Sequence, residues 1–318
     1  MTASRTKAVL VAGSANLDFV VRASHVPAPG ETVLGRDFAT FPGGKGANQA
    51  VACARAGGAT TRFVAAFGDD DVAKPLVDSL LEARVELAAV RIADVPTGTA
   101  FICVSDNAEN AITVAPGANA RLEPGHLPSL DDVGHLLMQL ETPLATVQSF
   151  AESARAVGAT VVLNAAPAQP LPLALLAALD VLVVNEGELD TLAGRDGTIA
   201  DRMSRVPVAT VVTTLGARGA CARTPEGWLV QSAWSVDAVD TTAAGDTFCG
   251  VFVAACARGA TTALALREAT AAAALACTRP GAQSSIPSRG EVERLIATPS
   301  PDTSIELATY CGIETSAA

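Results

Sequence analysis

Two short segments, each at the start of a predicted helix, carry the residue types best suited to chemistry. The first is DTTAAGDTF, residues 240–248, which leads into an apolar helix. The small residues Ala243, Ala244 and Gly245 let backbone N–H groups approach an anion, and the helix dipole adds positive potential there. The same dipole keeps Asp246 ionised, so that its carboxylate can accept a proton from a hydroxyl group beside a bound phosphate. The spacing alone fits a helix cap equally well.

The second segment is the glycine loop GGKGANQA, residues 43–50. It is not a Walker A loop, because Lys45 is followed by Gly46, and Gln49 stands where the GxGxxG fingerprint requires glycine. A tight turn remains that brings Lys45 and Asn48 close to a small polyhydroxylated ligand. A structural glycine turn is the alternative, although packing does not explain a lysine inside such a loop.

The elements that position these segments read as an α/β sheet. Residues 8–13 and 62–67 predict buried strands, residues 47–56 a helix, and residues 134 onward repeated strand–helix units of a parallel sheet. Polar residues follow the later apolar runs: Glu141, Asn164, Asn185, Thr213 and Thr214. Ligands bind at the carboxyl edge of such sheets, although any one of these residues also fits ordinary strand-end polarity.

Several further stretches have a different texture. Residues 98–105 and 111–114 alternate as antiparallel strands do, and residues 33–41 predict irregular strands, which together indicate a lid or a sheet edge.

Residues 250–277 are apolar but contain Arg258, Arg267 and Glu268, so we expect two helices of a soluble protein and no membrane span. Residues 298–318 are expected to be loosely attached.

Composition excludes several classes of function. The chain has 318 residues, 49% of them hydrophobic, a net charge of −11 and only three lysines, so nucleic acid is not an expected partner. An ATP site on so acidic a chain must depend on backbone donors, a metal ion and a few cations. Seven scattered cysteines without a CxxC pair indicate reduced thiols. The three histidines lack the spacing of metal ligands, which argues against a histidine metal site. The first 13 residues lack the pattern of a signal peptide, which favours the cytoplasm.

Several motifs, taken together and in order, resemble the phosphofructokinase-B type carbohydrate kinases, and most closely their ribose-phosphorylating members. The resemblance extends to about Arg294. The motifs are NLD at 16–18, PGET at 29–32, the glycine loop, MQLE at 138–141, NEGE at 185–188, TLGARG at 214–219, AAGDTF at 243–248 and GAQ at 281–283. It implies a ribokinase-like, three-layer α/β/α fold over residues 1–296, with a mainly parallel sheet and a small β lid at about 16–41 and 97–114. Residues 297–318 would be a C-terminal tail of unknown role.

The resemblance also implies an ATP:D-ribose 5-phosphotransferase with Asp246 as general base and an anion hole at Ala243, Ala244 and Gly245. The sugar would be held by residues matching the family's substrate site: Asn16, Leu17, Asp18, Gly44, Lys45, Gly46, Ala47, Asn48, Glu141 and Asp246. ATP would be held by Asn185, Thr214, Leu215, Gly216, Ala217, Arg218, Gly219, Gly245, Asp246 and Thr270.

Metal ions and a second subunit are implied in the same way. Glu188 would orient Mg²⁺, or another divalent cation, through water, and K⁺ would activate. The matching K⁺ positions are Asp240, Thr242, Ala276, Arg279, Gly281 and Ser285. We expect a homodimer joined through the lid.

The chain departs from the family pattern at two places and leaves alternatives open. Ala165 stands where these kinases usually have proline, and Thr242 where an apolar residue is usual. Another substrate of the same family, such as deoxyribose, a ketohexose derivative or a nucleoside, remains an alternative, as does a non-catalytic sugar sensor. A nicotinamide-dependent dehydrogenase is excluded because residues 13–16 lack the glycine fingerprint, and no GxSxG hydrolase elbow occurs.

Overall fold

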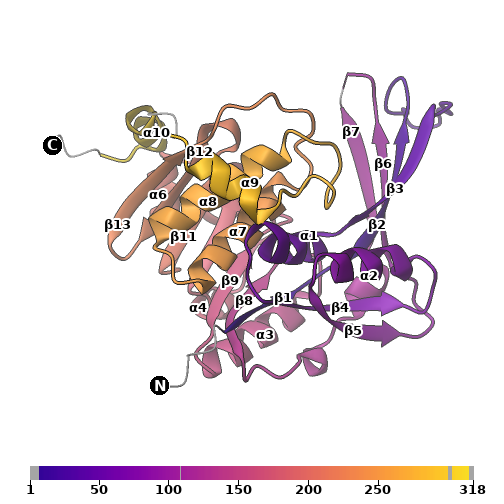
Figure 1. Ribbon diagram of the computed structural model, residues 1–318, viewed down its shortest axis with the longest axis horizontal. Helices are drawn as coiled ribbons and strands as arrows, with labels where there is room; N and C mark the ends of the chain where they lie inside the picture. Colours follow the sequence, from indigo (N-terminus) through magenta and orange to yellow (C-terminus); the bar gives the residue numbers. More distant parts are fainter. Residues whose placement is uncertain (1–6, 108, 300–302, 315–318) are drawn as a thin grey trace.

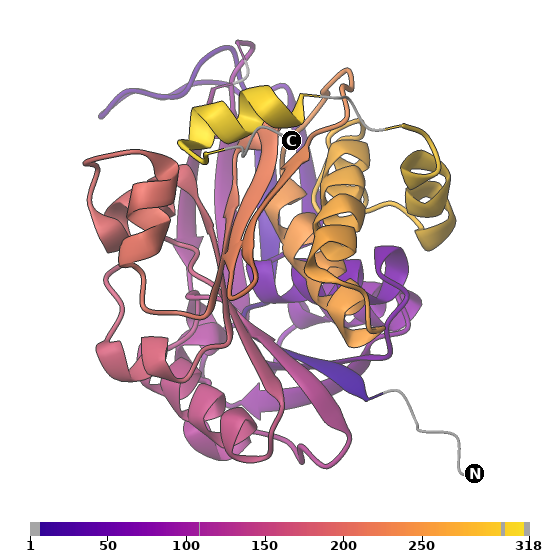
Figure 2. The same cartoon turned by 90° about the vertical axis from the view of Figure 1, so that its left-hand side faces the viewer.

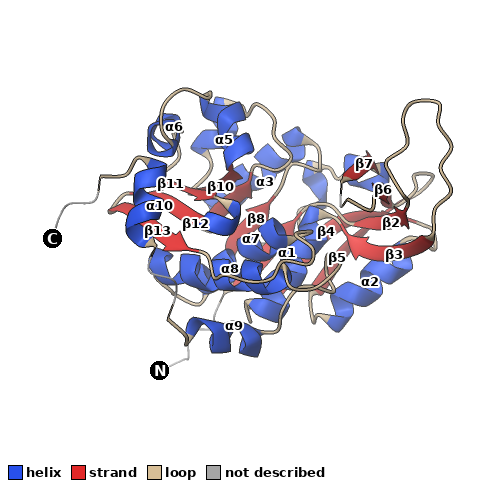
Figure 3. Cartoon of the chain, turned by 90° about the horizontal axis from the view of Figure 1, so that it is seen from above, coloured by secondary structure: helices blue, strands red, loops and turns tan. Residues whose placement is uncertain are grey.

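A nine-stranded, mostly parallel sheet forms the centre of the molecule. The computed structural model describes residues 7–107, 109–299 and 303–314. The strands of the large sheet are β1 (Ala8–Ala12), β4 (Thr61–Gly68), β5 (Glu86–Ile92), β8 (Val133–Met138), β9 (Thr160–Asn164), β10 (Val181–Asn185), β11 (Thr210–Thr214), β12 (Gly219–Thr224) and β13 (Gly227–Ser232). Their order is β13-β12-β11-β10-β9-β8-β1-β4-β5 (Figure 3). All pairs from β5 to β11 are parallel, as the apolar runs predicted for the strands other than β5. The alternating texture from residue 84 to 114 predicts antiparallel strands throughout, and β5 corrects this, because it pairs in parallel with β4.

Helices cover both faces of this sheet and complete the predicted three-layer α/β/α architecture (Figure 1). One face carries α1 (Lys45–Val51), α2 (Ala73–Glu82), α7 (Ala244–Ala257), α8 (Thr262–Ala276) and α9 (Arg289–Ile296). The other carries α3 (Leu144–Ala156), α4 (Leu173–Ala177), α5 (Glu186–Ala193), α6 (Ile199–Arg205) and α10 (Ser304–Cys311). Each layer has its own apolar core, because the strand side chains alternate between the two faces.

Small residues bring α7 close to the first helix of the chain. After α1 the chain continues as a π-helix, Ala52–Ala56, which packs on α7. A Cβ atom at Gly250 would meet the Gln49 carbonyl oxygen at 2.5 Å and the Cys53 nitrogen at 2.9 Å. Glycine is therefore required at this crossing, and the close approach sets the two helix starts beside each other.

A separate four-stranded sheet stands at the β5 end of the large sheet (Figure 1). Its strands are β2 (Asn16–Arg22), β3 (Asp37–Gly43), β6 (Gly98–Val104) and β7 (Asn110–Ala115), in the order β3-β2-β6-β7. We call this sheet the lid. The antiparallel pairing predicted for residues 98–105 and 111–114 is confirmed, with Phe101 opposite Thr113.

Two further sequence-based expectations are corrected by the fold. Strands β12 and β13 form an antiparallel hairpin, although strand–helix units were predicted from residue 134 onward. The hairpin turns at Pro225 and Glu226, and β13 begins at Gly227, whose φ of 131° favours glycine. The expectation of a loosely attached tail is wrong for residues 303–312, because α10 buries Leu307, Ala308 and Cys311 against the body. Among the described residues, no helix has the length and apolarity to cross a membrane.

Candidate active site

The starts of α1 and α7 meet in one buried cluster around Asp246. This carboxylate is only 8% exposed and accepts hydrogen bonds from Asn48 Nδ2 and Gln49 Nε2, both at 2.9 Å. Burial raises the pKa of Asp246, while the charge of Lys45 and the two amides oppose that rise. A carboxylate with a raised pKa is a stronger base, so Asp246 is suited to accept a proton.

Two glutamines that the sequence analysis did not assign to the site hold this cluster in place. Gln49 Nε2 also donates to Asn164 Oδ1 at 3.0 Å, and Gln49 Oε1 accepts from Gln139 Nε2 at 2.6 Å. Gln139 is fully buried just beyond the end of β8. The chain of amides ties Asp246 to the carboxyl ends of β8 and β9 and thereby fixes its orientation. A polar residue directly after an apolar strand was the available signal.

The glycine loop passes so close to other backbone that its glycines have no room for side chains. A Cβ atom at Gly44, where φ is 88°, would lie 2.7 Å from the Asn16 nitrogen, and one at Gly46 would lie 2.6 Å from the Ser14 nitrogen. The Lys45 N–H donates to Glu141 Oε2 at 3.1 Å, and Ser14 Oγ donates to the same oxygen at 2.5 Å. The loop therefore presents Lys45 beside Glu141.

Lys45 is surrounded by acidic side chains. The negative charge of Asp246 is the largest influence that raises the pKa of Lys45, with Glu141 and Glu188 adding to it and burial opposing it. Burial, together with repulsion from Glu141 and Asp246, raises the pKa of Asp18 to about 7. Hydroxyl groups of a sugar can donate to such carboxylates and accept from the ammonium group.

Two asparagines complete the end of this cluster nearest the lid. Asn16 is buried at the start of β2, and its Oδ1 accepts from Asn119 Nδ2 at 2.7 Å. Asn119 also bonds the backbone of Ala15, and it was not predicted, because nothing in the sequence around it marks a site. The buried Asn48 Oδ1 has no hydrogen-bond partner among the described residues, which leaves an acceptor for a ligand hydroxyl.

The start of α7, where the sequence predicts an anion hole, has open space beside it. Ala243 adopts the left-handed conformation at φ 58°, which is strained for a residue with a side chain. A Cβ atom at Gly245 would meet nothing within 4 Å, and the Gly245 N–H has no partner in the described ranges. The Ala244 N–H donates to the Thr241 carbonyl oxygen at 3.2 Å. Open space and a free N–H therefore coincide at Gly245, beside Asp246.

The residues predicted to hold ATP lie at the ends of β10 and β11 and on α8. Asn185 caps α5: its Oδ1 accepts the Glu188 N–H, and Glu188 Oε2 accepts the Asn185 N–H, both at 2.8 Å. Burial raises the pKa of Glu188, whereas the hydrogen bond from the Asn185 N–H and the charge of Lys45 act to lower it. The remaining predicted positions are Thr214 at the end of β11, Leu215 after it, the short 3₁₀ helix Gly216–Arg218, Gly219 at the start of β12, and Thr270 on α8. The buried hydroxyl of Thr270 has no partner in the described structure.

The predicted K⁺ residues gather partly around Asp240. Asp240 Oδ1 accepts from the N–H and hydroxyl of Thr242 at 2.9 and 2.6 Å, and Oδ2 accepts from the Gly281 N–H at 2.8 Å. Burial raises the pKa of Asp240, but these hydrogen bonds outweigh it and hold the pKa below its usual range. Of the other predicted positions, Ala276 ends α8, Ser285 is buried in the following loop, and Arg279 turns its side chain to Glu291.

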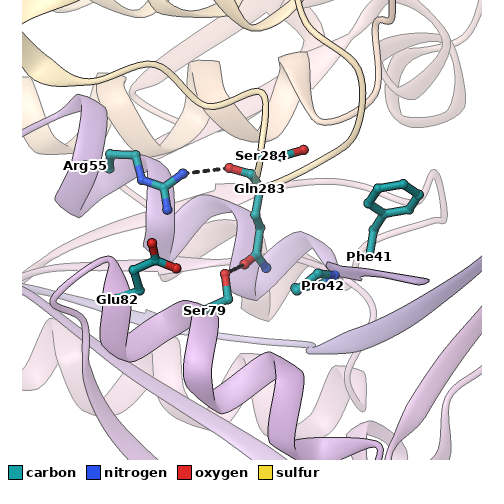
Figure 4. A pocket seen from close by; sticks show the side chains of 7 residues that line it. All are labelled: Phe41, Pro42, Arg55, Ser79, Glu82, Gln283 and Ser284. Atoms are coloured by element: carbon teal, nitrogen blue, oxygen red, sulfur yellow. Dashed lines mark hydrogen bonds between the residues drawn. The ribbon is translucent and has the colours of Figure 1, made fainter. Parts of the chain in front are cut away.

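A cavity of about 440 Å³ lies beside this loop and is separate from the Asp246 cluster (Figure 4). It is lined by Phe41, Pro42, Arg55, Ser79, Glu82, Gln283 and Ser284. Arg55 Nη1 donates to the Gln283 carbonyl oxygen at 2.7 Å, and Ser79 Oγ donates to Gln283 Oε1 at 2.6 Å. These bonds join Gln283 to the π-helix after α1 and to α2.

Comparisons with known proteins show which family the chain and its fold resemble. A family model described as "pfkB family carbohydrate kinase" matches residues 6–289. The ribokinase of Haemophilus influenzae is 39% identical over 90% of this chain and 97% of its own length. The crystal structure of a Thermotoga maritima ribokinase superposes with a TM-score of 0.85 at 36% identity, covering 92% of this chain and all of that one. The Arabidopsis thaliana ribokinase complexed with ribose and ATP gives 0.85 at 31% identity, covering 92% and 99%.

Proposed function

Because the chain belongs to the pfkB family of carbohydrate kinases, we propose that it phosphorylates D-ribose at the primary hydroxyl group with ATP as the phosphoryl donor. The observation that carries this proposal is the buried Asp246, held by Asn48 and Gln49 beside the open space at Gly245. A base and an anion site are thereby adjacent at the edge of the sheet where ligands bind.

In the proposed reaction, Asp246 accepts the proton of the primary hydroxyl group as that oxygen attacks the γ-phosphorus of ATP. The bond from this phosphorus to the bridging oxygen breaks, and ADP leaves with the electron pair. The Gly245 N–H and the start of α7 stabilise the negative charge of the transferring group. The fixed position of Asp246, set by two amides, supplies the alignment on which phosphoryl transfer mostly depends.

The sugar would lie between the glycine loop and the lid. Asp18, Glu141 and Lys45 offer paired contacts to neighbouring hydroxyl groups, and the free Asn48 Oδ1 accepts another. Gly44 and Gly46 let the loop pack against the backbone of residues 13–16 and so hold Lys45 and Asn48 toward the sugar, and closure of β2 and β6 over it would exclude water. The number of acceptors favours a pentose with free hydroxyl groups over deoxyribose.

The site residues fit the metal ions that the resemblance implies. Mg²⁺ usually keeps several waters and binds phosphates, so one carboxylate, Glu188, is enough to orient it. When bound, it would neutralise charge on the phosphates. Asp240 has a lowered pKa and stays ionised, which suits a monovalent cation held with carbonyl oxygens of the loop after α8.

The same proposal includes the compartment and the assembly state. We place the enzyme in the cytoplasm, where ATP is available and where its seven free thiols would stay reduced. We propose a homodimer joined through the lid, supported by the exposure of Phe38 and Phe101 on one lid face, at 65% and 54%.

Measuring ADP release over pentoses, hexoses and nucleosides tests the substrate, and the Asp246→Asn variant tests the base. Ribose should give the highest kcat/KM, and Asp246→Asn should lower kcat by about 10²- to 10⁴-fold, because asparagine keeps the shape but not the basicity. Asp201→Asn is the matched control, since Asp201 is also in the first turn of a helix but lies outside the site.

Two results would contradict the proposal. A nucleoside or a ketohexose that outperforms ribose tenfold would exclude ribose as the preferred substrate. Full kcat in a folded Asp246→Asn variant would show that Asp246 is only a helix cap. The control variant should keep wild-type kcat with a lower thermal midpoint, because Asp201 forms a capping box with Thr198.

A further inference from the structure

The C-terminal helix α10 lies beyond the family match, which ends at residue 289, and yet it is firmly attached. Its Leu307 and Cys311 are 4% and 0% exposed, and Thr303 Oγ1 donates to Ser232 Oγ at 2.8 Å. The helix ends at Gly312, where φ is 74° and where a Cβ atom would meet Thr198 at 2.4 Å. Figure 2 shows α10, in yellow, lying across one end of the large sheet.

One residue of α10 contacts both segments of the chain that carry residues predicted to bind ATP. The Tyr310 hydroxyl donates to Glu186 Oε2 at 2.8 Å, and Glu186 is the first residue of α5, directly after Asn185. The guanidinium carbon of Arg218 lies 4.2 Å from the centre of the Tyr310 ring, and Arg218 ends the short 3₁₀ helix after β11. Tyr310 therefore connects the start of α5, directly after β10, with the short 3₁₀ helix after β11.

The charges involved explain why this connection matters. In the described part of the chain Glu186 and Arg218 form no ion pair with each other, so Tyr310 is their common partner. If the Glu186 side chain were free to turn toward a bound triphosphate, its negative charge would repel the phosphates. If Arg218 moved freely, its positive charge would spend less time near the phosphates and would attract them less. The hydrogen bond and the cation–π contact restrict both side chains.

We propose that Tyr310 is a positioning residue for the nucleotide, so that α10 sets the placement of the two ATP loops. The inference rests on the proposed function, because it takes residues 185–188 and 214–219 to be the nucleotide loops. It gives a role to a helix that lies outside the family match, which ends at residue 289.

Tyr310→Phe and Tyr310→Leu separate the two contacts. Phenylalanine keeps the ring under Arg218 and loses the hydrogen bond, whereas leucine loses both. We expect the KM for MgATP to rise about twofold to threefold in Tyr310→Phe and about threefold to tenfold in Tyr310→Leu. The KM for ribose should stay within twofold. Ile305→Ala, at a position 69% exposed on the same helix, is the matched control and should leave both constants unchanged.

Direct binding of a non-hydrolysable ATP analogue, measured by calorimetry without sugar, checks the result independently of turnover. Its Kd should follow the MgATP KM across the variants, with thermal midpoints near wild type. Unchanged nucleotide affinity in both Tyr310 variants, or an equal rise of both KM values, would overturn the positioning role and leave the proposed function intact. Failure of the wild-type chain to bind the analogue would instead refute the proposed function.

Discussion

At the scale of single residues, the site is defined by its excess of negative charge. Lys45 is the one lysine among Asp18, Glu141, Glu188 and Asp246. The charges of Glu141, Glu188 and Asp246 each act on the pKa of another member of this group, and the pKa of Asp18 is raised by two of them. Burying like charges costs free energy unless a ligand or a cation compensates for it. The folded protein therefore bears a cost at this site, and a sugar with MgATP would relieve it.

Asp18 offers a measurable consequence of that cost. Its pKa is raised from 3.8 to about 7, so the folded state favours the protonated form and ionisation destabilises it. Stability associated with this group is present below pH 4 and is lost as the pH rises through 7. We expect Asp18→Asn to be more stable than wild type at pH 8 by roughly 2 to 4 kcal/mol, and to match it near pH 4.

Thermal or denaturant unfolding at pH 4 and pH 8 checks whether Asp18→Asn is the more stable protein only at the higher pH. Asp201→Asn is the control, and its stability should change with pH in the opposite direction. The N–H and hydroxyl of Thr198 donate to Asp201 and lower its pKa. That control should lose stability at pH 8 and lose less at pH 3. A destabilised Asp18→Asn variant at pH 8 would mean that Asp18 is well solvated or ion-paired in the folded protein. The variant should also raise the KM for ribose.

At the scale of elements, the loop between α8 and α9 is coupled to the start of α7. Asp240 accepts hydrogen bonds from both Thr242, which leads into the proposed anion site, and Gly281 in that loop. A cation held there would fix the segment that carries Ala243 to Gly245. We expect K⁺ to raise kcat by about fivefold or more over tetramethylammonium at equal ionic strength.

The Asp240→Asn variant provides the control for this prediction. It keeps the size of the side chain but loses the charge, so its kcat should no longer respond to K⁺. Equal rates of the wild-type enzyme in both salts would refute the cation site. An unchanged K⁺ response in Asp240→Asn would move the site away from Asp240.

The sequence could predict those parts of the site in which the residues of one functional group are neighbours in the chain. The glycine loop and the AAGDTF segment are such groups, and the parallel strands follow from apolar runs of matching length. Asn119 could not be found this way, because it reaches Asn16 across 103 positions of the chain. The packing of α10 was missed because a short amphipathic segment between polar residues looks the same whether or not it has a surface to bury against.

At the scale of the whole molecule, the lid leaves an apolar face uncovered. Phe19 stacks with Phe38 and Phe101 at ring-centre distances of 6.2 and 5.4 Å, and the two outer rings are more than half exposed. A lid of four strands has little core of its own, so a second copy packed on this face would both stabilise it and hold it near the proposed sugar site. The proposed dimer would in this way support the closed lid.

Phe101→Asp tests that arrangement. Sedimentation and light scattering should show a wild-type dimer at micromolar concentration, with the variant weakened about 30-fold or more, because an unpaired carboxylate in an apolar interface costs at least about 2 kcal/mol. Its KM for ribose should rise, since Phe101 lies on β6 opposite Phe19, the residue after Asp18. Leu173→Asp, at a position 76% exposed on α4, should leave assembly and kinetics unchanged. A wild-type monomer with full activity would show that the lid closes over the sugar without a partner.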